Sequence, residues 1–214
     1  MSRSTVELLR TQVLDGTLLP GTRLIELQLA EQYSVSRATV RIAIGELVKE
    51  GLVDHEPNRG AIVRRVDLTE AIRITEVRAL LEGFMAARAA AQATTGQRHE
   101  LLELIRQMRE SVEARQLARY SELNTALHRR IHEISRHEIA ADVVQNLRNR
   151  AVHHEFRLAL VPGRAAESLP QHVAIVDAIV EGDAARAQNA MRAHLDSVVA
   201  VLTHWAELGL PGTR

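Results

Sequence analysis

The run LARYSELNTALHRRIHEIS at residues 117–135 places two polar side chains, Asn124 and His128, one helical turn apart. Residues four apart share a face of a helix, and this face must also bury leucine and isoleucine. A polar pair on an apolar face costs free energy unless a partner satisfies it. The pair is therefore either an ordinary buried hydrogen bond or half of a binding site.

Two further histidines, His172 and His194, belong to apolar rows of predicted helices and are expected to point into the protein interior. The rows are Ile175, Val176 and Ile179 for the first, and Ala187, Met191, Val198 and Val201 for the second. A lone histidine on an apolar face is more often a satisfied core residue than a ligand. Three on three helices favour a metal site, because imidazole is the commonest metal ligand.

A second group of residues suits contacts with DNA. Arg37 and Arg41 lie four residues apart near the start of a predicted helix, so both project from one face. The first residues of a recognition helix are those that reach base edges, and the hydroxyls of Ser36 and Thr39 suit phosphate or base contacts. Arg59 lies in a predicted hairpin, where it suits a phosphate or minor-groove contact. The alternative is that these arginines are merely solvated.

The composition is ordinary for a globular protein of one large or two modest domains. The 214 residues are 46% hydrophobic and 25% charged, and no apolar run is long enough for a membrane helix. The absence of cysteine excludes disulfides and thiolate metal sites, and the first residues do not resemble a signal peptide. We therefore expect a cytoplasmic protein. The formal net charge is zero, but local clusters matter more for nucleic-acid binding than net charge.

Residues 1–66 are predicted to form three short helices and a β-hairpin. The first helix stops before the turn cluster DGTLLPG at 15–21, and the second fits LIELQLAEQYS at 24–34. The third has Ser36 as its N-cap and ends at Gly51. The runs LVDHE and AIVRRV flank PNRG and indicate a hairpin. This order is that of a winged helix-turn-helix domain, whose third helix enters the DNA major groove.

Residues 67–214 are predicted to be entirely helical. Apolar periodicity indicates a first helix in LTEAIRITEVRALLEGFMAARAAAQ and further helices at 97–113, 116–135, 138–157, 167–181 and 183–207. Breaks are expected at 94–96, at 161–170 and at Gly182. The predicted fold is therefore mainly α, with a bundle of six or seven helices behind the DNA-binding module. Such a bundle can enclose a ligand pocket between its helices.

The motifs resemble a known family. The runs DGTLLPGTRLIELQLAEQYSVSRATVR, ELVKEGLV and NRGAIVRRV are similar to the N-terminal domain of GntR-type bacterial transcription regulators. The runs ITEVRALLEGFMAARAA and QHVAIVDAIVEGDAARAQNAMRAHL resemble the FCD ligand-binding domain of the FadR subgroup. The family commonly shows Ser-Arg-Thr-Pro-Val-Arg-Glu-Ala, whereas this chain has SRATVRIAI. The two arginines are retained, and the base specificity is expected to differ.

The resemblance implies a metal site. Many FCD domains bind a divalent metal through an Asp and a His four residues apart and two later histidines, which correspond here to Asn124, His128, His172 and His194. The amide of Asn124 is a weaker and neutral ligand, so metal affinity is expected to be lower. With neutral ligands the ion keeps its double charge, which favours a carboxylate effector in its open positions. The nitrogen-rich set fits zinc, with nickel or manganese as alternatives.

The resemblance also implies that Arg78, in the run VRALLEG, lines the pocket and pairs with the effector carboxylate, as a planar guanidinium does well. The alternative is an ion pair with Glu82, four residues further along the helix, which contributes only about 0.2–0.5 kcal/mol on a helix surface.

We therefore predict a ligand-responsive transcription regulator, not an enzyme. It is expected to be a repressor released by a small carboxylate, and a homodimer on a palindromic operator. One alternative is a metal-dependent hydrolase, because three histidines with open metal positions can activate water, although no acidic residue lies at an evident general-base position. The other is an effector-free DNA-binding dimer with a structural polar cluster, a reading that Asn124 keeps open.

Overall fold

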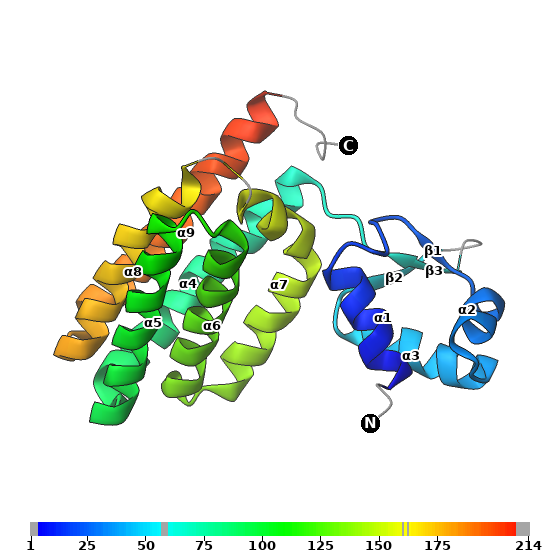
Figure 1. The fold of residues 1–214 in the computed structure, drawn as a ribbon, viewed down its shortest axis with the longest axis horizontal. Coiled ribbons are helices and arrows are strands. Elements are labelled where there is room, and N and C mark those ends of the chain that lie inside the picture. Colours follow the sequence, from blue (N-terminus) through cyan, green and yellow to red (C-terminus); the bar gives the residue numbers. More distant parts are fainter. Residues whose placement is uncertain (1–3, 57–59, 160, 162, 209–214) are drawn as a thin grey trace. The chain divides into compact units, whose positions relative to one another are not determined.

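The computed structural model describes residues 4–56, 60–159, 161 and 163–208, and leaves aside the side chains of residues 56, 152–157 and 159. The chain forms two compact units, one of residues 1–66 with 146–153 and one of residues 67–145 with 154–214 (Figure 1). The described helices include none that is long and apolar enough to cross a membrane.

The first unit contains three helices and a small sheet. Its elements are α1 (Thr5–Leu14), β1 (Arg23–Leu24), α2 (Glu26–Tyr33), α3 (Arg37–Lys49), β2 (Val53–Glu56) and β3 (Gly60–Val63). The strands are antiparallel in the order β1-β3-β2, with Val53 opposite Val63 and Arg23 opposite Ile62. This is the predicted winged helix-turn-helix, with β2 and β3 as the hairpin.

Local signals fix the ends of these helices. Ser4 and Glu7 form a reciprocal capping box at the start of α1, and Ser36 caps α3 by accepting a hydrogen bond from the Thr39 amide. Between α2 and α3 the chain turns at Ser34, which has a left-handed backbone with φ of 53°. The core beneath them is apolar and includes Leu9, Val40, Leu47, Leu52 and Val63.

The structure corrects one boundary in this unit. Leu24 was predicted to begin the second helix, but together with Arg23 it forms β1 and pairs with β3. The helix begins two residues later, at Glu26, with Ile25 as an N-cap that makes no side-chain hydrogen bond. A strand of two residues is too short to show the alternating hydrophobic pattern by which strands are predicted. Its conformation depends instead on pairing with β3, which is distant in the sequence.

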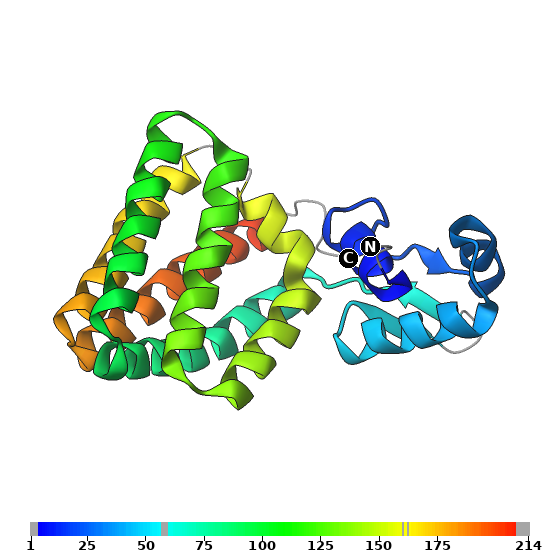
Figure 2. The ribbon, with the colours of Figure 1, turned by 60° about the horizontal axis from the view of Figure 1, so that its bottom comes forward.

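The second unit is a bundle of helices. They are α4 (Leu68–Gln92), α5 (Thr95–Glu113), α6 (Leu117–Ser135), α7 (Glu138–Ala159), α8 (Arg164–Glu181) and α9 (Ala184–Glu207). The long helix α4 packs along α9, while α5 lies beside both α6 and α8 (Figure 2). The six described helices match the predicted bundle. Residues 146–153, inside α7, group with the first unit.

The start of α8 differs from the prediction. The helix begins at Arg164, after Gly163 with φ of 83°, whereas the break was expected to reach residue 170. Pro170 therefore lies inside the helix, in its second turn, where its ring removes one backbone hydrogen bond. The early start matters because it makes Arg164 part of a buried helix end.

The interior of the bundle is apolar except for one polar group. Its core includes Leu127, Ile131, Ile175, Ile179 and Met191, all of them fully buried. Among these apolar side chains lie buried polar and charged residues, namely Arg78, Glu82, His128, Arg164, Ser168, His172 and His194. Buried polar groups need partners, and their partners define the candidate site.

Candidate metal centre and DNA-binding helix

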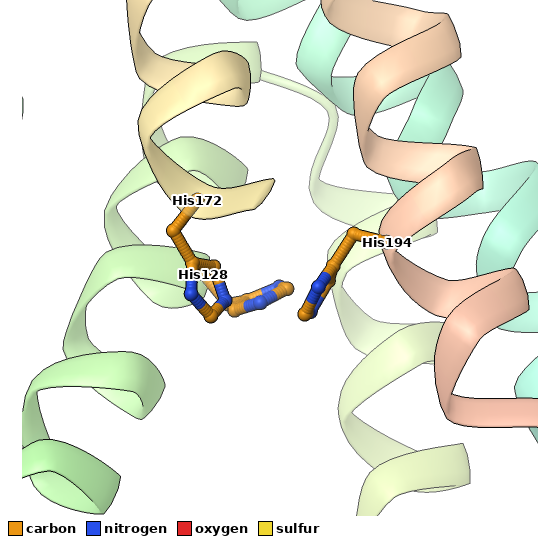
Figure 3. Close-up of side chains that lie close together, drawn as sticks. All are labelled: His128, His172 and His194. Atoms are coloured by element: carbon orange, nitrogen blue, oxygen red, sulfur yellow. The ribbon is translucent and has the colours of Figure 1, made fainter. Parts of the chain in front are cut away.

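Three histidines from three helices meet inside the bundle. His128 comes from α6, His172 from α8 and His194 from α9, and their side chains converge on one point (Figure 3). The ring centroids of His172 and His194 lie 4.4 Å apart, and His128 lies 5.6 Å and 5.5 Å from them. One nitrogen of each ring lies within 4.8 Å of the other two, which is close enough for the three to share a metal ion.

The Nδ1 atom of each ring has a partner from another residue. His128 Nδ1 lies 2.7 Å from Glu82 Oε2, and His194 Nδ1 lies 2.8 Å from Gln171 Oε1. Carboxylate and amide oxygens accept hydrogen bonds, so these Nδ1 atoms carry the hydrogen and Nε2 keeps its lone pair. This is the tautomer that an Nε2 metal ligand requires.

His172 is held in a similar way. Its Nδ1 lies 3.1 Å from the hydroxyl of Tyr120, which in turn lies 2.7 Å from the hydroxyl of Ser168. Its Nε2 is buried and has no hydrogen-bond partner among the described residues. An unsatisfied buried nitrogen costs free energy, and a metal ion in contact with Nε2 would satisfy it. The residues present therefore fit a metal ion.

Asn124 is a second unsatisfied group in this region. It lies one turn before His128 on α6, and its Oδ1 is buried without a hydrogen-bond partner in the described part of the chain. An amide oxygen is an acceptable, neutral metal ligand. The sequence left two roles for Asn124, an ordinary internal hydrogen bond or part of a binding site. Because its Oδ1 accepts no hydrogen bond among the described residues, the first role is not fulfilled through this oxygen.

Glu82 lies behind His128 and is fully buried. Its Oε1 accepts a hydrogen bond from Arg78 Nε at 2.9 Å, and its Oε2 lies 3.1 Å from His132 Nε2 as well as against His128. With His128 and His132 it forms a second group whose atoms could hold a metal ion. The three-histidine group is the better candidate, because in the second group the His128–Glu82 hydrogen bond already uses the atoms that would bind.

The electrostatics favour neutral imidazoles and a charged carboxylate. Burial lowers the pKa of His172 and His194 well below the ordinary value, and repulsion from neighbouring histidines and from Arg164 lowers it further. Burial alone would raise the pKa of Glu82, but the charge of Arg78 and the hydrogen bonds of His128 and His132 hold it well below its ordinary value. Neutral imidazole is the form that binds a metal.

Sequence reasoning missed Glu82 as a neighbour of the histidines. From the sequence, no acidic residue was found at an evident general-base position, and the contact between Glu82 and His128 was not identified. Glu82 was assigned only to Arg78, and that ion pair is indeed present in the structure. The signal was available: Glu82 lies on a buried row of α4 with Thr75, Ala79 and Ala86.

His132, Tyr120 and Gln171 were also missed, and each is a partner of the cluster. His132 lies four residues after His128, so helical spacing places it on the same side. Nothing local marks Tyr120 or Gln171, because each meets a histidine of another helix. The side chains of His153 and His154 lie outside the described part of the chain.

Helix α3 presents Arg37 and Arg41 on the surface of the first unit. The side chains of Arg37 and Arg41 are 62% and 66% exposed, and both pair with Glu26 of α2. Arg41 does so in a bidentate manner, with distances of 2.8 Å and 2.7 Å. The hydroxyls of Ser36 and Thr39 lie 2.9 Å apart at the start of the helix. Arg59 lies outside the described residues.

The model of the GntR family of bacterial regulatory proteins matches residues 1–63, and the model of the FCD domain matches residues 73–197. The chain belongs to the GntR family and carries an FCD domain. The presence of an FCD domain fits the predicted membership in the FadR subgroup of this family. A regulator of this family binds DNA, and it is not an enzyme.

Relatives of this GntR regulator carry similar names. It is 27% identical over 201 residues to the HTH-type transcriptional repressor RspR of Escherichia coli, covering 92% of this chain and 87% of that protein. It is 31% identical to an HTH-type transcriptional regulator in an unstable DNA locus of Streptomyces ambofaciens, covering 94% and 86%. The solved structure of E. coli McbR/YncC has the same fold, with a TM-score of 0.78, 23% identity and coverage of 95% and 99%.

Proposed function

We propose that this GntR regulator is a metal-containing, ligand-responsive repressor. In this proposal residues 1–66 bind DNA and residues 67–214 form the effector-binding and dimerisation domain. The observation that carries the proposal is the set of three buried histidines whose Nδ1 atoms are all engaged by other residues. Such an arrangement prepares three Nε2 atoms for one metal ion.

The proposed ligands are His128, His172, His194 and the amide oxygen of Asn124. Zinc is the preferred ion because the set is rich in nitrogen, and nickel or manganese are the alternatives. When bound, the ion would supply a positive charge with open positions for an anion. Because all four proposed ligands are neutral, they leave that charge undiminished, and a small carboxylate is the proposed effector.

The proposed DNA contacts are Ser36, Arg37, Thr39, Arg41 and Arg59. The exposure of the two α3 arginines and the N-cap position of Ser36 support this assignment. Bacterial DNA lies in the cytoplasm, so this function places the protein there. A repressor is favoured over an activator because the relative RspR is named a transcriptional repressor.

A homodimer is proposed because a surface of the helical unit is unusually apolar. Five large side chains are between 41% and 76% exposed, namely Val77, Leu80 and Phe84 of α4 and Ile139 and Val143 of α7. Phe84 contacts the ring of His137 just before α7, which joins the two rows into one apolar patch. Exposed patches of this kind mark protein interfaces, and a second copy would match a palindromic operator.

Arg78 was predicted to bind the effector, and that assignment remains a proposal. Its Nε donates to the buried carboxylate of Glu82. A carboxylate effector would therefore have to share this guanidinium with a residue that already neutralises its charge.

The test is the metal content of tag-free protein, measured by elemental mass spectrometry. We expect wild-type protein to contain about one divalent metal ion per chain, as three-histidine sites do. We expect His172→Ala to contain none. His204→Ala is the matched control, because His204 is exposed on the same bundle. The proposed metal centre is wrong if wild-type protein stays free of metal after incubation with zinc, nickel and manganese salts.

A second measurement addresses regulation. Operator affinity is followed by fluorescence anisotropy of a labelled palindrome selected from random DNA, with and without a panel of small carboxylates. Release of DNA by one of them would support a ligand-responsive repressor. If none changes the affinity of the metal-loaded protein, the protein is an effector-free DNA-binding dimer.

A further inference from the structure

Arg164 is a buried arginine without a buried counter-charge. It is the first residue of α8 and is only 8% exposed. Its Nη2 donates to the neutral hydroxyl of Ser197 at 3.0 Å. Among the described residues the only carboxylate within ion-pair distance is Glu167, at 3.7 Å, and the side chain of Glu167 is 70% exposed.

The contrast with Arg78 shows what Arg164 lacks. Both guanidinium groups are buried, but Arg78 lies 2.9 Å from the fully buried carboxylate of Glu82. Burying an unpaired charge is costly, and burial lowers the pKa of Arg164. The long contact with an exposed glutamate compensates little, because water screens it. Arg164 is therefore placed to receive an anion from outside the chain.

Arg164 lies beside the histidine cluster. The hydroxyl oxygen of Ser197 lies 2.7 Å from the backbone carbonyl oxygen of His194 and 3.1 Å from Gln171 Oε1, and Gln171 Oε1 lies 2.8 Å from His194 Nδ1. Through Ser197 the guanidinium of Arg164 is thus connected to His194, a proposed metal ligand.

The charges around the cluster do not balance. Glu82 pairs with Arg78, and imidazoles that bind a metal ion do so as neutral ligands. A bound divalent ion and Arg164 would then leave three positive charges without a buried carboxylate among the described residues. An effector with one negative charge would neutralise only part of this, whereas an effector with two carboxylates could pair with both centres.

We propose that Arg164 is the second anion-binding group of the effector site, and that the effector is a small dicarboxylate. One carboxylate lies at the three-histidine metal centre and the other pairs with Arg164. This inference rests on the proposed metal centre for its first half only, because the buried charge of Arg164 requires an anion in either case.

The test compares two four-carbon acids, succinate with two carboxylates and butyrate with one. Their dissociation constants are measured by isothermal titration calorimetry on zinc-loaded and on metal-free full-length protein. Wild-type zinc-loaded protein is expected to bind succinate about 10- to 100-fold more tightly than butyrate, the usual effect of a hydrogen-bonded ion pair. Equal affinities for the two acids would overturn the dicarboxylate proposal without any variant.

Arg164→Gln is expected to remove the preference for succinate, because succinate loses much more affinity than butyrate. Arg164→Lys should restore part of the preference, because it keeps the charge but loses the planar fork. Arg186→Gln is the matched control, since Arg186 is an exposed arginine of α9 paired with Glu181. Succinate binding that is the same in Arg164→Gln and wild type would show that this arginine does not bind the effector.

The outcomes separate this inference from the proposed function. Protein that binds zinc but shows no preference for succinate retains the metal centre and loses the present inference. Protein that binds no zinc loses the metal centre. If such metal-free protein still binds succinate, and Arg164→Gln abolishes that binding, Arg164 remains an anion site.

Discussion

At the scale of single residues, Glu82 connects groups that the sequence presents as separate. Its two oxygens bind Arg78 on its own helix and both His128 and His132 on α6. A carboxylate behind a metal-binding imidazole fixes the ring and makes it a stronger ligand. In the proposed metal centre this carboxylate would act on the ion indirectly, through His128, whereas Asn124 would offer a neutral oxygen to the ion itself.

Glu82→Gln should therefore weaken metal binding about 10- to 100-fold, the range seen when such supporting partners are removed. The amide oxygen introduced by this substitution can still accept a hydrogen bond from His128. A loss of zinc affinity would therefore come from the removed charge rather than from a changed shape. Zinc affinity is measured by competition with a chromogenic chelator. Glu103→Gln on α5 is the control, because Glu103 is an exposed glutamate paired with an arginine. Equal zinc affinity in Glu82→Gln and wild type would contradict this role.

The buried histidines make the metal-free protein sensitive to mild acid. His172 and His194 have pKa values well below 6.5 in the fold, whereas in the unfolded chain they take up protons near that pH. The unfolded state then binds more protons, so the free energy of unfolding falls as pH drops below about 6.5. Each histidine contributes up to ~1.4 kcal/mol per pH unit.

Urea unfolding in the presence of a chelator, between pH 7.5 and pH 5.5, measures this slope. His172→Gln should flatten it by about half, because one of two such histidines is removed. His204→Gln, at an exposed position, should leave it as in wild type. Parallel curves for His172→Gln and wild type would show that His172 is protonated in the fold. Glu82 affects only more acidic solutions, since its pKa lies below 4.5.

The histidines were predictable from the sequence, but their partners were not. Apolar rows on three helices indicated that His128, His172 and His194 point inward, and all three are buried. Tyr120 and Gln171 could not be found in this way, because their contacts depend on how α6, α8 and α9 are rotated against one another. Helical spacing tells which face a residue occupies, but it does not tell which residue of another helix it meets.

At the scale of elements, α2 supplies the carboxylate that pairs with the two exposed arginines of α3. Glu26 is the first residue of α2 and pairs with both Arg37 and Arg41, and the hydrogen bonds of Arg41 hold the pKa of Glu26 below its ordinary value. The carboxylate fixes the direction of Arg41, and in the proposed DNA complex it would compete with phosphate for this guanidinium. Both effects would favour binding to specific over non-specific DNA, because an oriented guanidinium reads base edges whereas a free one binds any phosphate.

Glu26→Gln should therefore tighten binding to random DNA and reduce the ratio of specific to non-specific affinity. Each additional phosphate contact steepens the dependence of log affinity on log salt by about 0.9, so the slope for random DNA should rise by about one unit. Anisotropy titrations at several salt concentrations measure both quantities. Glu31→Gln, an exposed change on the same helix, controls for net charge. A loss of random-DNA affinity would refute the competition.

The order of elements followed from the sequence, whereas two helix starts did not. Caps such as Ser36 and breaks such as Gly182 are local signals, and the structure places helix ends at both. The strand at Arg23 and the early start of α8 at Arg164 depend on partners distant in the sequence. The second of these errors hid Arg164, which had been assigned to a loop.

At the scale of the whole molecule, the exposed apolar patch on α4 and α7 would relate the proposed metal centre to the proposed dimer. Helix α4 presents Leu80 and Phe84 to solvent on one face and Arg78 and Glu82 to the interior on another. In a dimer formed through this outer face, the α4 helix of each copy would contact the other copy on one side and its own histidine cluster on the other. An effector that shifts this helix would then act on both halves of the dimer, as two-state regulation of a symmetric dimer requires.

Leu80→Glu with Ile139→Glu should separate the proposed dimer, because charged residues would be buried in an apolar contact. Sedimentation velocity should show a monomer, and binding to a full palindrome should fall to the level of a single half-site, since the two recognition helices no longer bind as one unit. Leu102→Glu, on α5 and 40% exposed, tests whether any added charge has this effect. Zinc content should be unchanged in the double variant, because its histidines lie within one chain. A dimer that persists would place the interface on another surface and leave the patch unexplained.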